Sequence, residues 1–136
     1  MWEKMDITWK YTTEIQNKNV FSEIEKERNI EIPVELKEFI NKTNSGTPSQ
    51  YNFMLGNIEK VFGAVLSYNK NEEGVDSVFT ALEVVKNKDL LPFGIDPFGN
   101  YICYSLKEHV IVFWDHENNE VFSTKLGLKQ FIDSLY

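Results

Sequence analysis

The sequence predicts an α+β fold: a single domain over residues 1–136, with a mixed, mostly antiparallel meandering sheet packed by about four helices. Three observations favour this class. The 136 residues are 42% hydrophobic and 14% aromatic, which suits one domain built around one core. Several segments space their apolar residues as amphipathic helices do. Between residues 90 and 124, short runs of branched and aromatic residues alternate with polar turns, as in an antiparallel meander.

The first elements expected are two helices joined by the extended link "NIEIP". One spans residues 20–28 and the other residues 34–44, where Pro33 suits the start of a helix and "NSGTP" ends it. Their apolar stripes are formed by Val20, Phe21 and Ile24 in the first helix and by Leu36, Phe39 and Ile40 in the second.

The middle of the chain suits two strands followed by a helix. Residues 50–68 are expected to form the strands, with a turn at Gly56-Asn57 and a bulge at Gly63. After the polar loop "NKNEEG", residues 75–85 are expected to be helical. The buried face of this helix is expected to consist of Val78, Leu82 and Val85.

The C-terminal third predicts the meander. Its strands are expected near residues 90–95, 101–106, 110–115 and 120–124. The strand at 110–115 is apolar on both faces, so it is expected to be central and covered. A closing helix over residues 128–135 has apolar residues at i, i+3, i+4 and i+7, which lets one stripe lie on the sheet.

The segment "PFGIDPFGNYICY" contains two glycines, Gly94 and Gly99, at the spacing of a phosphate-binding loop. Such a loop needs Lys and then Ser or Thr after the second glycine, and it leads from a strand into a helix. Here Asn100 and Tyr101 follow, and the chain continues as a strand. We therefore expect a strand-connecting turn in which both glycines serve backbone geometry and no nucleotide binds.

Charge and composition restrict the partners. A net charge of −7 argues against binding to nucleic acid or to a membrane, because both require clustered Lys and Arg. Partners are expected to be neutral or basic, and an acidic surface also promotes solubility without any partner. Glu3 and Asp6 interrupt any apolar signal segment, and the single Cys103 fits a reducing compartment. A cytoplasmic protein is therefore expected.

The residue pattern does not predict catalysis. The two histidines, His109 and His116, have no accompanying nucleophile motif, and His109 is expected to be a solvated turn residue. "WDHENNE" gathers carboxylates around His116, but it lacks the glycine and bidentate carboxylate of a calcium loop and the second histidine or thiol of a zinc site. We expect a polar hairpin turn in which Asn118-Asn119 tolerates positive φ, and neither enzymatic activity nor a metal or other cofactor.

Most aromatic side chains are expected to pack in the core. Those expected at exposed edges are Tyr51, Tyr68, Phe98 and Trp114. Exposed rings are of interest because aromatic residues often anchor protein interfaces.

Three segments occur in an unusual combination, order and spacing. They are "IPVELKEFINKTNSG" at residues 32–46, "LLPFGIDPFGNYICYSL" at residues 90–106 and "VIVFWDHENNEV" at residues 110–121. With them the chain resembles, over most of its length, the SUKH superfamily, which contains bacterial contact-toxin immunity proteins and the fungal cell-wall assembly regulator domain. The resemblance implies an α+β fold with a mixed, largely meandering sheet. The double glycine usual after the second helix of that family is Ser45-Gly46 here, a departure that concerns loop geometry.

The resemblance implies a binding module: an immunity protein that captures and neutralises a cognate bacterial toxin, expected to be a basic nuclease, by direct protein contact. The alternative is a non-toxin adaptor, a regulatory protein-interaction domain like the fungal regulator. We expect the contacts to lie on an acidic and aromatic edge, because loops on a rigid sheet concentrate binding residues. The candidate partner-binding residues are Glu72, Glu73, Asp96, Phe98, Asp115 and Glu117.

Overall fold

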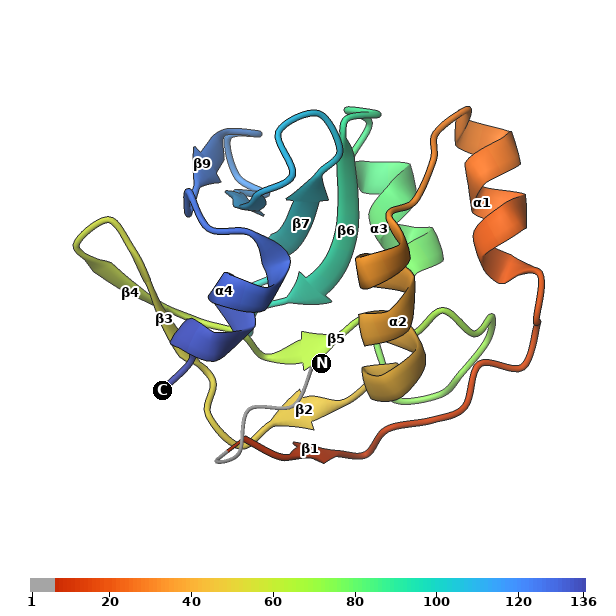
Figure 1. Cartoon of the computed structure of the whole chain (residues 1–136), viewed down its shortest axis with the longest axis horizontal. Helices are drawn as coiled ribbons and strands as arrows, with labels where there is room; N and C mark the ends of the chain where they lie inside the picture. The colour runs from red at the N-terminus through yellow and green to blue at the C-terminus, as the bar shows by residue number, and fades with distance from the viewer. Residues whose placement is uncertain (1–6) are drawn as a thin grey trace.

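The computed structural model of the chain describes residues 7–136 (Figure 1). Glu3 and Asp6, which argued against a signal segment, lie outside the described residues. The helices are α1 (Val20–Arg28), α2 (Val34–Thr43), α3 (Val78–Val84) and α4 (Leu128–Ser134). The strands are β1 (Trp9–Lys10), β2 (Thr47–Pro48), β3 (Asn52–Leu55), β4 (Ile58–Val61), β5 (Ala64–Val65), β6 (Leu90–Ile95), β7 (Tyr101–Ser105), β8 (Ile111–Trp114) and β9 (Val121–Ser123). The predicted α+β class is confirmed.

The main sheet has five strands in the order β5-β6-β7-β8-β9, so β6 to β9 form the predicted meander. Two small sheets, β1-β2 and β3-β4, accompany it. Within residues 7–136 every strand pair is antiparallel, and the only parallel bridge is an isolated one between Ser67 and Ser77. The strands therefore form antiparallel sheets, without the parallel pair that a mixed sheet requires.

The helices lie close to where the sequence placed them, with one shift at α3. This helix begins at Val78 because Ser77 is its N-cap, and the Ser77 hydroxyl accepts the backbone N–H of Phe79 at 2.9 Å. Its buried residues are Val78 and Ala81, and the C-cap Val85 is also buried, whereas Leu82 is only half-buried. The prediction for Leu82 was wrong because this residue borders a groove beside α1.

The predicted turn at Gly56-Asn57 has the expected position, whereas Gly63 has a different role. Gly56 and Asn57 connect β3 to β4. Gly63 is not a bulge: its N–H donates to the carbonyl oxygen of Ile95 at 2.9 Å where the chain passes from β4 to β5. The irregular strand pairing lies instead in β6, whose register with β7 shifts between Pro92 and Gly94. Because Gly94 has no Cβ, the Phe62 ring can approach it; a Cβ there would lie 2.7 Å from that ring.

Aromatic rings fill the core between the sheet and the elements on one of its faces. The Phe39 ring of α2 meets Phe93 of β6 at 5.9 Å, and Phe53 of β3 meets Phe131 of α4 at 5.0 Å. Figure 1 shows α2 and α4 on the near side of the sheet. Every residue of β8 is buried, as predicted for a central strand. None of the helices in residues 7–136 has the length and apolarity needed to span a membrane.

Candidate binding site

The turn between β6 and β7 is organised by a buried carboxylate. Asp96 is only 6% exposed, and its Oδ1 accepts the backbone N–H groups of Phe98 and Asn100 at 2.9 and 2.8 Å. Its Oδ2 accepts a hydrogen bond from Nδ2 of Asn100 at 2.9 Å. Gly99, at φ +88°, supplies the left-handed conformation that the turn requires. Asp96 therefore holds the turn from within and is not the exposed edge carboxylate that the sequence suggested.

Phe98 is presented by this turn to solvent. Its side chain is 75% exposed, whereas its backbone N–H is held by Asp96. An exposed ring on a backbone that is already ordered is suited to bind a partner, because little backbone freedom remains to be lost on binding.

The turn between β8 and β9 carries the exposed acidic residues. Asn119 adopts φ 59°, as predicted, and its Oδ1 accepts the indole N–H of Trp114 at 2.6 Å. Asp115 is half-buried and accepts the backbone N–H of Glu117 at 2.9 Å. The side chains of Glu117 and Glu120 are exposed. Asn118 Nδ2 also donates to Glu120 Oε1 at 2.7 Å, so this turn is ordered as well, while its two glutamates remain exposed.

Asn100 joins the two turns. Its Oδ1 accepts the backbone N–H of His116 at 3.0 Å and lies 2.7 Å from Nδ1 of the same residue. In an antiparallel meander the β6–β7 and β8–β9 turns lie at the same end of the sheet, and this contact connects them directly. The structure thus brings together Asp96, Phe98, Asp115 and Glu117, four of the six predicted site residues.

The other two predicted residues, Glu72 and Glu73, lie in the loop after β5. Glu72 is half-buried, and its Oε1 accepts hydrogen bonds from Ser67 Oγ at 2.6 Å and Thr13 Oγ1 at 3.1 Å. Its other oxygen accepts one from Asn69 at 3.3 Å. Glu72 therefore ties this loop to the N-terminal segment, whereas Glu73 is exposed.

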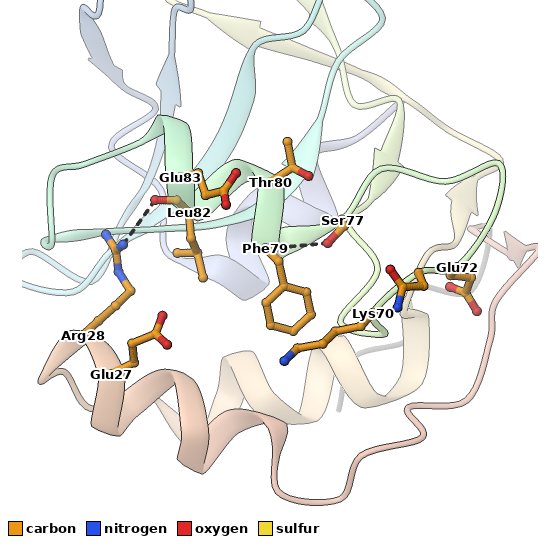
Figure 2. A pocket seen from close by; sticks show the side chains of 10 residues that line it. Glu27, Arg28, Lys70, Glu72, Ser77, Phe79, Thr80, Leu82 and Glu83 are labelled. Carbon is orange, nitrogen blue, oxygen red and sulfur yellow. Dashed lines mark hydrogen bonds between the residues drawn. The ribbon is translucent and has the colours of Figure 1, made fainter.

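The loop with Glu72 borders a groove of about 560 Å³ between α1 and α3 (Figure 2). At one end the Arg28 guanidinium donates to the carbonyl oxygens of Leu82 and Val85, both at 3.3 Å. At the other end Lys70 Nζ lies 5.3 Å from the centre of the Phe79 ring. Because Arg28 satisfies carbonyl groups at the C-terminus of α3, its main role here is to hold α1 against that helix.

Two of the four rings expected at exposed edges are buried. Tyr51 and Phe98 are exposed as predicted. Tyr68 is buried, with its hydroxyl donating to the carbonyl oxygen of Pro92 at 3.0 Å. Trp114 is buried because its ring stacks on Tyr101 at 5.8 Å and its N–H is bonded in the turn. The predictions for Tyr68 and Trp114 were therefore wrong.

The remaining chemically reactive groups are separate from the two turns. His109 is exposed in its turn, as predicted, and Cys103 is a fully buried strand residue whose thiol pKa is raised by burial. Tyr104 donates to Glu35 Oε2 at 2.6 Å; burial, followed by this carboxylate, raises the pKa of its hydroxyl. Among residues 7–136, no three His, Cys, Asp or Glu side chains cluster where they could hold a metal ion.

The chain thus combines a helix-packed antiparallel meander with an exposed aromatic ring and exposed carboxylates at one end of the sheet. The SUKH_6 family model, described as SMI1-KNR4 cell-wall, matches residues 18–132. The chain belongs to this family, and thus to the SUKH superfamily, which includes immunity proteins and SMI1/KNR4 regulators. A comparison with curated proteins found no match.

Proposed function

We propose that the chain is an immunity protein that binds a cognate bacterial toxin, a basic nuclease, and neutralises it by direct contact. One observation carries the proposal: Phe98 is 75% exposed on a turn that buried Asp96 holds in place. A large exposed ring contributes nothing to the core of the domain, but it is the type of residue that anchors protein interfaces.

The charge around Phe98 supports a basic partner. Glu117 and Glu120 are exposed on the neighbouring turn, which Asn100 links to the turn of Phe98. The whole chain has a net charge of −7. Nucleases carry cationic surfaces because they bind phosphate groups, so an acidic inhibitor would attract them and compete for the same surface.

We propose that neutralisation is by occlusion and not by catalysis. The two linked turns contain one imidazole, that of His116, whose Nδ1 is occupied by Asn100. Neither turn supplies a hydroxyl or thiol nucleophile beside it. We also propose that the chain acts in the cytoplasm, where an incoming nuclease would reach its substrate and where Cys103 stays reduced.

The test is inhibition of a toxin encoded beside the gene for this chain. The purified toxin should form a stoichiometric complex with the chain and lose nuclease activity, and Phe98→Ala should weaken both effects. The matched control is Val34→Ala, because Val34 is an apolar residue of similar exposure, 68%, at the start of α2. A toxin that stays active at saturating concentrations of the chain would refute the proposal.

The family description favours a second candidate, a regulatory adaptor of the SMI1-KNR4 type. Such an adaptor would use the same exposed turn to bind a partner that has no toxic activity. Cells that produce the partner without this chain distinguish the two functions: they should stop growing if the partner is a toxin and grow normally if it is a regulatory target.

A further inference from the structure

The five-stranded sheet has one covered edge and one open edge. On the β5 side, the N–H of Val65 donates to the carbonyl oxygen of Gly46 at 2.8 Å, so that edge is occupied. On the other side, among residues 7–136, β9 pairs only with β8, and all three of its residues are exposed. An open edge strand offers unpaired backbone groups to another strand.

The direction of the open groups follows from the pairing of β9 with β8. The N–H of Asp115 donates to Glu120 O at 2.9 Å, and the N–H of Thr124 donates to Ile111 O at 3.0 Å. The backbone N–H and C=O groups of successive residues in an antiparallel strand point alternately to its two sides. The backbone groups of residue 122 therefore point toward β8, like those of residues 120 and 124. The N–H and C=O groups of Val121 and Ser123 therefore face outward.

We propose that the β9 edge accepts an extended basic strand of the partner protein, which lengthens the five-stranded sheet by one strand. This inference rests on the proposed function and adds the mode of binding. Strand addition obtains affinity from main-chain hydrogen bonds and specificity from side chains on the two faces.

The side chains of β9 fit such a strand. Val121 is 45% exposed and pairs with Trp114, whereas Phe122 is 41% exposed and pairs with Phe113. These two side chains project to opposite faces of the sheet. An added strand would cover both, and it would continue the apolar faces of β8 without disturbing the existing pairs.

The charge of the chain selects a basic strand over a second copy. Exposed Glu117 and Glu120 lie in the turn that leads directly into β9. Two copies of the chain would each have a net charge of −7, which opposes self-association. At the other end of β9 lies Lys125, so the positive charge of the partner strand should be concentrated beside Glu120.

The proposal can be tested on the full chain, labelled with ¹⁵N, by titration with a short peptide that alternates lysine with valine. A peptide with glutamate in place of lysine is the control. The lysine peptide should shift the amide signals of Val121 and Ser123 and slow their hydrogen exchange, while Phe122, already bonded to β8, changes little. Equal effects of the two peptides, or no effect at Val121 and Ser123, would overturn the proposal. Dimerisation without peptide would identify a second copy as the occupant and would also overturn it.

Substitutions at the edge separate hydrogen bonding from packing. Ser123→Pro removes an outward N–H and leaves the bonds to β8, so it should weaken peptide binding roughly fivefold, the effect of one lost hydrogen bond. Ser123→Ala keeps the N–H and should bind like the wild type. If the proline variant does not fold, Glu120→Lys serves instead: it should weaken binding of the lysine peptide and strengthen binding of the glutamate peptide.

The peptide test and the toxin test fail independently. A toxin that is neutralised while Val121 and Ser123 remain unprotected in the complex would refute the added strand and leave the immunity function in place. Peptide binding at β9 with no neutralisation of the toxin would refute immunity and leave the edge as a binding surface.

Discussion

Asn100 holds His116 by two contacts from one oxygen: its Oδ1 accepts the backbone N–H at 3.0 Å and lies 2.7 Å from the imidazole Nδ1. The amide nitrogen of Asn100 donates to Asp96, which fixes the orientation of the amide. The Nδ1 of His116 must then be the donor, so the neutral ring carries its proton on Nδ1 and presents Nε2 on the other side.

Removal of this link should destabilise the protein and release one turn from the other. We expect Asn100→Ala to lower the free energy of unfolding by about 1–3 kcal/mol, because it leaves buried hydrogen-bonding groups unpaired. Chemical denaturation measures this loss. Asn41→Ala, on the exposed part of α2, is the control and should change stability by less than about 0.5 kcal/mol. If the ¹⁵N spectrum of the wild type shows the His116 proton on Nε2, the hydrogen-bond assignment is wrong.

Phe98 should matter for binding and not for folding. Because the ring is 75% exposed, we expect Phe98→Ala to change the free energy of unfolding by less than about 0.5 kcal/mol. The complex with the toxin should weaken by about 2 kcal/mol, or roughly thirtyfold, seen mainly as faster dissociation. Surface plasmon resonance separates the two rates. Loss of stability that matches the loss of binding would contradict this assignment.

The sequence predicted the meander well because its strands and turns are local features. The boundaries of β6 agree with the prediction, and β7, β8 and β9 differ from it only at their ends. The sequence did not predict β1 and β2, which contain two residues each and exist only because they pair with one another across the chain. Such short strands have no periodicity of their own.

The site was predicted in part. The turn of Phe98 and the acidic turn after Trp114 were identified from turn residues, and antiparallel order brings them together. The buried role of Asp96 was missed, although Asp frequently bonds backbone groups ahead of it in turns. The burial of Tyr68 depends on Pro92, far away in the sequence, so no local pattern could show it.

Glu25 should make stability depend on pH in the acid range. Its pKa is lowered, first by the backbone N–H of Ile32, which donates to Oε2 at 2.8 Å, and then by Lys37 at 3.3 Å. A lowered folded-state pKa stabilises the protein above the unfolded value, about 4.3 for glutamate, and the effect is lost as the pH falls through the folded value. Glu25→Gln should therefore be less stable than the wild type near neutral pH.

Denaturation of the two proteins from pH 7 down to strongly acid conditions tests this relation. The difference in unfolding free energy should shrink as the pH falls below the ordinary glutamate range. Glu23→Gln, an exposed change on the same helix, is the control. A difference that grows with acidity would have the wrong sign for a lowered pKa.

Cys103 should report on unfolding. The residue is 0% exposed, and burial raises the pKa of its thiol, so the reactive thiolate is suppressed in the folded state. A thiol reagent should therefore react only as the domain opens, and its rate should rise with denaturant. Cys103→Ala combined with Ser123→Cys places a single thiol on exposed β9, where it should react at once. Fast reaction of wild-type Cys103 in native buffer would contradict its burial.

Charge reversal at two exposed carboxylates separates long-range attraction from local contact. Glu117 lies in the turn linked to that of Phe98, whereas Glu73 lies in the loop that borders the groove between α1 and α3. Both contribute to the negative field that would draw the proposed basic toxin toward the chain. Glu117→Lys and Glu73→Lys should therefore both slow association severalfold and weaken its dependence on salt. Only Glu117→Lys should also speed dissociation, because its carboxylate is beside the proposed interface.

Stopped-flow association between low and physiological salt measures the change in association rate, and competition with unlabelled chain measures the change in dissociation rate. Binding that is insensitive to salt and to both reversals would exclude electrostatic attraction by these loops. A change in dissociation at Glu73 equal to that at Glu117 would instead move the contact surface toward the groove.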